Sequence, residues 1–158
     1  MLETALAWIA ASPVAAALKS SRYAYPVVNA VHIMGLAALF GSIVTLDLRL
    51  LGAFRTVPAR ALATALPRVA AVGLVVAILS GAALFSVEPA DYAANRAFLI
   101  KLALVLIGAA HAIAVHFTGG WRDLAHGRGG IDAGLRLSAA ISLAIWTSAI
   151  IAGRFIAF

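Results

Sequence analysis

The sequence predicts an all-α integral membrane protein, a four-helix bundle preceded by a short interfacial helix. The prediction comes from the composition, from four long apolar runs and from the basic joints between them. The chain has 158 residues, of which 64% are hydrophobic and 11% charged, and its mean hydropathy is +1.04. Soluble domains carry roughly 25% charged residues, so this chain cannot cover a water-exposed surface. We expect a single domain over residues 1–158.

Four apolar segments are long enough to cross a bilayer, which takes roughly 20 helical residues. They lie at about residues 26–50, 67–87, 97–118 and 135–157. Pro58, Pro67 and Pro89 lie in or beside the joints, where a missing N–H costs least. Small residues spaced by four, such as Gly73 and Ala77, predict close packing of the second segment against a neighbour.

Residues 1–21 differ from the four spans. Ser12 followed by Pro13 is typical of a helix start, with proline at the first helical position. The apolar stretch that follows is too short to span, and no basic segment precedes it, so it does not resemble a cleaved signal peptide. We expect an amphipathic segment on the membrane surface, with Trp8 as an interface anchor.

The basic residues predict an orientation. Seven flank the first and third joints: Arg49, Arg55, Arg60, Arg68, Arg122, Arg128 and Arg136. Five lie on the other side, diluted by acidic residues: Lys19, Arg22, Arg96, Lys101 and Arg154. The seven-residue side is expected in the cytoplasm, which places both termini outside. Because the net charge of +6 is spread over short joints, it indicates membrane topology and no nucleic-acid partner.

The absence of cysteine removes several classes of site. With no cysteine in the chain, disulfides, thiolate metal sites, iron–sulfur clusters and covalent haem attachment are excluded.

Polar residues within the first span are the first candidate site. Tyr25, Asn29 and His32 follow at spacings of four and three, so they share one helix face. Because lipid rejects polar groups, we expect this face to line a pocket inside the bundle. The alternative is a core histidine whose ring is hydrogen-bonded to a neighbouring helix.

The third span adds His111 and His116, which are five residues and therefore about 140° apart, so they do not chelate one ion from one face. Either one could pair with His32 as an axial ligand of haem b, and the metal would then be bound only through the haem. Depth argues against one shared haem, because the offset from His32 along the membrane normal is about 12 Å for His111 and about 19 Å for His116.

Two cations near the outer helix ends form a second candidate cluster. Lys101 and Arg154 are expected to meet haem propionates, another carboxylate or a quinone oxygen if they turn inward. The alternative is that both side chains snorkel to the interface. On the inner side, Asp47 and Arg49 are expected to pair locally with the basic joint.

The segments "YPVVNAVHIMGLAALFGSIVTLDLRLLG" and "LSGAALFSVEPADYAANRAFLIKLAL", together with "AHAIAVHF" and "SLAIWTSAIIAGRFIAF", resemble the DUF6644 family of small four-helix bacterial membrane proteins. The resemblance runs from about Leu6 to Phe158 and implies a bacterial inner-membrane location. The family pattern has a histidine at His116 but usually asparagine at the place of His111, which weakens a shared ligand role for His111. A looser similarity in architecture links the chain to four-helix b-type cytochromes and copper-resistance membrane proteins.

Three functions follow from these observations. The first is a haem b electron-transfer protein that passes electrons to quinone. The second is a non-enzymatic membrane subunit that binds a partner membrane protein, or a small-ligand-binding protein, in which the histidines are structural. The third, a solute permease, is disfavoured because four short unbroken helices leave little room for a pathway.

Overall fold

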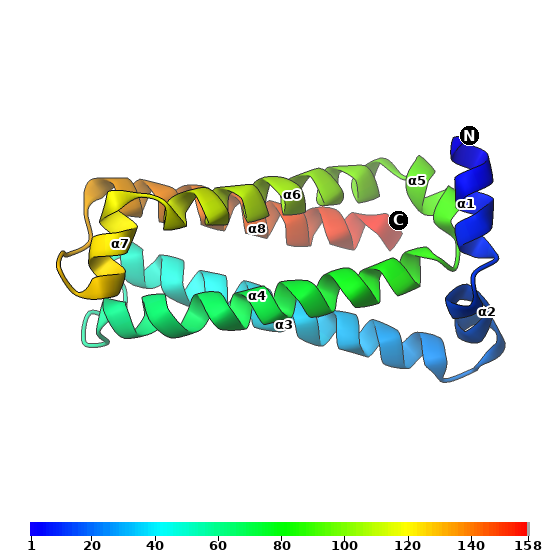
Figure 1. The fold of residues 1–158 in the computed structure, drawn as a ribbon, viewed down its shortest axis with the longest axis horizontal. Helices are drawn as coiled ribbons and strands as arrows, with labels where there is room; N and C mark the ends of the chain where they lie inside the picture. The colour runs from blue at the N-terminus through cyan, green and yellow to red at the C-terminus, as the bar shows by residue number, and fades with distance from the viewer. Residues whose placement is uncertain (158) are drawn as a thin grey trace.

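The computed structural model describes residues 1–157 and is entirely helical over that range. Four long helices run along the molecule and shorter ones lie at its two ends (Figure 1). The elements are α1 (Leu2–Ala10), α2 (Pro13–Ser20), α3 (Ala24–Leu51), α4 (Ala59–Phe85), α5 (Pro89–Ala94), α6 (Arg96–His116), α7 (Gly119–His126), α8 (Ala133–Arg154) and the 3-10 turn η1 (Phe155–Ala157). Helices α3, α4, α6 and α8 are long and apolar enough to cross a membrane. The all-α four-helix prediction is therefore confirmed, and only Phe158 of the predicted domain lies outside the described residues.

The second long helix begins eight residues earlier than the predicted span, so Pro67 lies inside α4 and not at the joint. Pro58 takes the N-cap position instead. Membrane helices tolerate an interior proline because neighbouring groups re-satisfy the backbone carbonyl that loses its donor.

The N-terminal segment forms two short helices across one end of the bundle, and both chain ends lie at that end (Figure 1). Helix α2 starts where the sequence predicts, because the Ser12 side chain accepts the Ala15 N–H at 3.2 Å and Pro13 occupies the first turn. Helix α1 packs against α5.

Glycine brings α3 and α4 into backbone contact. A Cβ on Gly35 would lie 2.9 Å from the Ala77 nitrogen, and one on Gly73 would lie 2.6 Å from the Leu39 nitrogen. The predicted small-residue ridge of α4 is therefore the surface that receives α3, and van der Waals packing of this kind drives helix association in lipid.

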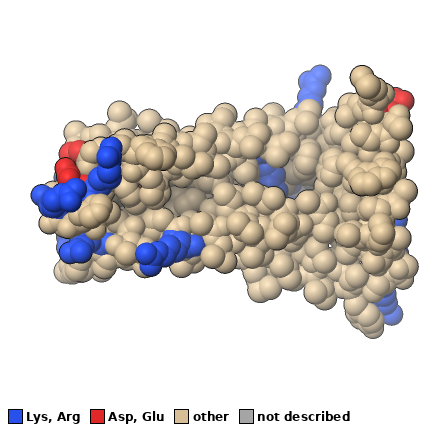
Figure 2. All heavy atoms as spheres, viewed as in Figure 1, with Lys and Arg blue, Asp and Glu red and all other residues tan. Residues whose placement is uncertain are grey.

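The bundle is open on one side. Helix α3 packs against α4 and α8, and α8 packs against α6, whereas α4 and α6 are not a closely packed pair within the described part of the chain. A hollow consequently runs between the two helix pairs (Figure 2). The end that carries α7 is closed by a core of buried residues: Leu46, Leu50, Ala63, Trp121, Leu124, Leu135 and Ala139.

Candidate functional site

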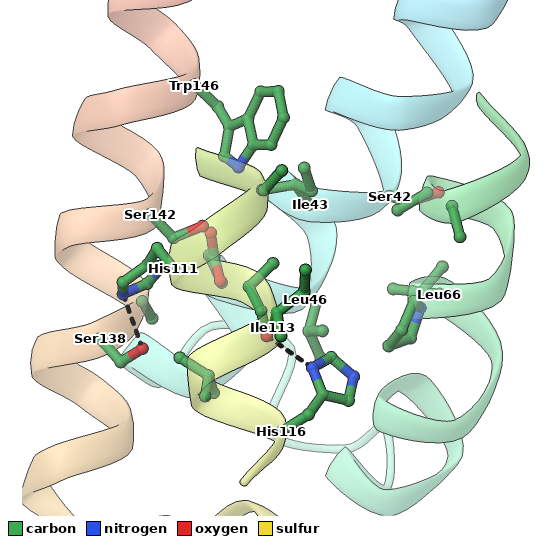
Figure 3. Close-up of a pocket in the computed structure, with 18 of the residues that line it drawn as sticks. Ser42, Ile43, Leu46, Leu66, His111, Ile113, His116, Ser138, Ser142 and Trp146 are labelled. Atoms are coloured by element: carbon green, nitrogen blue, oxygen red, sulfur yellow. Dashed lines mark hydrogen bonds between the residues drawn. The ribbon is translucent and has the colours of Figure 1, made fainter. Parts of the chain in front are cut away.

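A cavity of about 460 Å³ occupies the half of the bundle near α7 (Figure 3). All four long helices contribute to its walls, and Trp121 contributes from α7. Most of the lining side chains are apolar, such as Leu46, Leu66 and Ile113. Cavities that hold small molecules combine such walls with a few placed polar groups, and the polar groups here come from α3, α6 and α8.

The first of these polar groups is Asp47 of α3. Its side chain is only 6% exposed, and its Oδ2 atom is buried without a hydrogen-bond partner. The Ser142 side chain of α8 is hydrogen-bonded to the same carboxyl group. The expected local pairing of Asp47 with the basic joint is wrong, because Asp47 lies on the buried face of α3 while Arg49 donates to the Val57 carbonyl at 2.8 Å.

Helix α8 connects Asp47 to a histidine. Ser138 and Ser142 lie one turn apart, and the Ser138 Oγ lies 3.2 Å from Nε2 of His111 (Figure 3). Two hydroxyls on one face of α8 therefore stand between a carboxyl on α3 and an imidazole on α6. The sequence contained a signal for this arrangement, since both serines interrupt an apolar span at helical spacing, but it did not identify the residues they meet.

The two histidines of α6 both border the cavity but point to different sides of the helix (Figure 3). His111 faces α8, as its contact with Ser138 shows. The Nδ1 atom of His116 lies 2.7 Å from the Ala112 carbonyl oxygen, and its ring centroid is 4.6 Å from that of Trp121. His116 is thus an exposed residue at the end of the helix, with its ring tilted against Trp121 of α7, and it does not converge with His111.

His32 lies outside this cavity, at the interface of α3 and α4. Its Nδ1 atom is 2.9 Å from the Ala77 carbonyl oxygen and 3.1 Å from the Ser80 Oγ. A carbonyl oxygen only accepts, so Nδ1 carries the proton and Nε2 carries the lone pair. Gly81 gives the ring its space, because a Cβ there would lie 3.0 Å from the His32 Cε1.

Tyr25 and Asn29 do not join His32 in a pocket. Both are exposed, because α3 and α4 diverge toward the end that carries α1 and α2 (Figure 1). Tyr25 is instead hydrogen-bonded to Tyr92 of α5. Burial, followed by that bond and the nearby Glu88, raises the pKa of Tyr92 to about 12.

The histidines do not fit one shared haem. Asp47 and His111 contact Ser142 and Ser138, which lie one turn apart on α8, so they differ in depth by about one turn. His32 lies fifteen residues before Asp47 along α3, which is about 22 Å of helix. His116 is five residues beyond His111 along α6, about 7.5 Å further toward α7. Two axial imidazoles must face one iron, which this offset does not permit. Within residues 1–157 no group of three or more His, Cys, Asp or Glu side chains could hold a metal ion.

The two predicted outer cations differ in burial. The Lys101 side chain packs along Gly153 of α8, whereas Arg154 is exposed at the end of that helix. At the start of α6, the Asn95 side chain caps the helix by accepting hydrogen bonds from the N–H groups of Ala97 and Phe98.

Comparison with known proteins agrees with this architecture. A family model described as a family of unknown function, DUF6644, matches residues 7–158. No curated protein and no solved structure matches the chain. Since the match covers nearly the whole sequence, the chain belongs to the DUF6644 family.

Proposed function

We propose that this membrane protein binds a small, lipid-soluble molecule that carries a hydroxyl group, of the phenol or quinol class, in the cavity beside α7. The observation that supports this most directly is the buried Asp47 Oδ2 without a partner. A buried carboxyl oxygen that lacks a donor costs about 1–3 kcal/mol or more. A ligand hydroxyl would supply that donor.

The walls suit an apolar ring or chain. Leu66, Ile113 and Trp146 line the cavity beside the polar cluster, so the rest of the ligand would contact hydrocarbon. The unpacked side between α4 and α6 gives a route from the bilayer, and a ligand dissolved in lipid would not have to cross the polar interface to enter.

The polar groups favour a neutral ligand in its reduced form. An ammonium would bring a charge to desolvate in an apolar site, which is expensive. A quinone offers only acceptors, whereas a quinol hydroxyl can donate to the Asp47 Oδ2 atom that lacks a partner. Ser138 and His111 provide a second polar contact about one helical turn away.

Haem-based electron transfer has less support. His32 has the hydrogen-bonded Nδ1 and open Nε2 that many metal-binding histidines have, but neither His111 nor His116 lies level with it. Haem b therefore stays a prediction. Its test is the absorption spectrum of protein purified from haem-replete cells, in which we expect no Soret band that depends on both His32 and His116.

The orientation is also part of the proposal. The α7 end gathers basic side chains on the face seen in Figure 2, which supports placing it in the cytoplasm of a bacterial inner membrane with both termini outside. Reporter fusions at either terminus test this topology.

Tryptophan fluorescence tests the ligand proposal. Trp121 and Trp146 line the cavity, and Trp8 is 77% exposed on α1, so the Trp8→Phe protein reports only on the cavity. The probes are para-hexylphenol and its methyl ether, which share a shape but differ in the donor. We expect saturable changes in tryptophan emission with the phenol and about tenfold weaker binding of the ether, as for loss of one buried hydrogen bond.

Asp47→Leu should remove the preference for phenol over ether. The matched control is Asp123→Asn, because Asp123 is a carboxylate at the same end of the bundle that is exposed and paired with Arg128 at 3.1 Å. Equal binding of the two probes to the unmodified protein would refute the proposal.

A further inference from the structure

A second, separate feature is the position of Lys101 inside the membrane-spanning region. It lies five residues after the start of α6 and is half-buried. A Cβ placed on Gly153 would lie 3.3, 3.4 and 3.5 Å from the Lys101 Cδ, Cε and Nζ. The whole side chain therefore lies against α8, and its ammonium is held within the bundle instead of extending along α6 to the water.

Among residues 1–157, no acidic side chain forms an ion pair with this ammonium. The charge of Lys101 acts on His32, whose Nδ1 proton is already directed at the Ala77 carbonyl. Within residues 1–157 the ion pair found joins Arg128 to Asp123 at the opposite end, and Lys101 makes no hydrogen bond. Figure 2 shows basic atoms recessed in the hollow between the helix pairs.

An unpaired charge at this depth is costly. A lysine within a membrane span usually faces the bundle interior or a water-filled cavity and pairs with another group. Lys101 faces the interior and has no ion-pair or hydrogen-bond partner within residues 1–157, which leaves its ammonium available to a partner from outside the chain.

We propose that Lys101 binds the singly charged oxyanion of an acyl-chain lipid, either the carboxylate of a free fatty acid or the phosphodiester of an anionic phospholipid. One ammonium matches one negative charge, and lysine suits a compact anion as a point charge. The next residue, Leu102, is exposed and apolar, so an acyl chain attached to the anion stays in contact with hydrocarbon.

This site is independent of the cavity near α7. Lys101 is not among the residues that line that cavity. Asp47 lies fifteen residues beyond His32 along α3, which is about 22 Å of helix. Loss of one site therefore leaves the other intact, and the two proposals fail separately.

The two lysines of the chain allow a direct test. Lys101 and Lys19 are the only lysines, and Lys19 lies exposed in α2 near the same end of the bundle. Protein labelled biosynthetically with carbon-13 at lysine Cε, in phosphatidylcholine nanodiscs, should give two resonances, which Lys19→Gln assigns. Lys19 then reports the change in surface charge, and Lys101 reports the site.

On titration with oleate we expect the Lys101 resonance to shift and saturate near one oleate per protein, while Lys19 follows only the bilayer charge. Oleyl alcohol should shift neither. A Lys101 shift with phosphatidylglycerol but not with oleate identifies the phospholipid as the ligand. A shift with both lipids shows that the oxyanion alone determines binding. Parallel shifts of the two lysines, or no Lys101 shift with either lipid, would overturn the proposal.

Native mass spectrometry gives a second measurement. Lys101→Gln should lower the fraction of protein that retains one oleate or phosphatidylglycerol by several-fold, and Lys19→Gln should not. Equal retention by the two variants counts against the site.

Discussion

The Nδ1–H of His32 donates to the Ala77 carbonyl oxygen 2.9 Å away and joins α3 to α4 within an apolar interface. This bond explains how a titratable ring is accommodated in the first span, where an unpartnered polar group would cost about 2–7 kcal/mol. Ser80 reinforces the contact at 3.1 Å from the same nitrogen.

Replacing His32 with leucine should destabilise the folded protein. The change removes an interhelical hydrogen bond, worth about 0.5–1.5 kcal/mol, and disturbs the packing of the ring on Gly81. Thermal unfolding in detergent should therefore show a lower Tm. His116→Leu is the control, because His116 is exposed and its Nδ1 bonds within its own helix; a drop of the same size there would refute the interhelical explanation.

Adding one methyl group at Gly73 should separate α3 from α4. A Cβ there would lie 2.6 Å from the Leu39 nitrogen and 2.7 Å from the Gly35 oxygen, and backbone atoms cannot rotate away. Overpacking of this kind costs about 1–3 kcal/mol, so Gly73→Ala should lower the Tm.

Gly41→Ala is the matched control, since a Cβ at Gly41 meets nothing within 4 Å. Both variants gain the same helix propensity, so the difference between their unfolding free energies isolates the contact. Equal stabilities would show that α3 and α4 are not in close backbone contact at Gly73.

Tyr92 should make stability depend on pH in the alkaline range. Its folded pKa is raised from 10 to about 12, first by burial and then by the Tyr25 hydrogen bond. The neutral phenol is therefore favoured in the folded state, and this contribution is complete below pH 10 and is lost as pH rises toward 12. Absorbance titration of the tyrosinate band should show one of the three tyrosines ionising late, and Tyr92→Phe should abolish that step.

Much of the fold could be predicted from the sequence, because lipid imposes simple rules. Apolar length predicted four membrane helices, Ser12 and Pro13 predicted the start of α2, and the ridge through Gly73 predicted close packing. Pro67 was misplaced because the prediction used the water-soluble rule that proline ends a helix.

The candidate site could be predicted only in part. Which face of each helix turns inward depends on the helix neighbours, and a single sequence does not give the order α4–α3–α8–α6. The sequence singled out His32 as a polar residue within an apolar span. Its partner could not be predicted, because it is the backbone carbonyl of Ala77 and any residue type has such a group. Asp47 was assigned to the basic joint because Arg49 is close in sequence, although the two side chains leave α3 on different faces.

The indole of Trp146 lies on Gly108, and this contact should control the size of the ligand cavity. A Cβ on Gly108 would lie 2.8 Å from the Cε2 and Cζ2 atoms of Trp146. Trp146 is 3% exposed and lines the cavity, so it has little room except toward the cavity itself. Gly108→Ala should therefore push the indole inward and reduce the space for a ligand.

The measurement uses the Trp8→Phe background described for the phenol probe. We expect Gly108→Ala to weaken para-hexylphenol binding by about tenfold, the effect of about 1.4 kcal/mol of lost contact, and to shift the emission of Trp146. Gly41→Ala serves again as the control, because it adds the same methyl group without touching a tryptophan. Unchanged affinity together with a shifted emission would show that the indole moves but does not border the bound molecule, and would place the ligand on the α7 side of the cavity, next to Trp121.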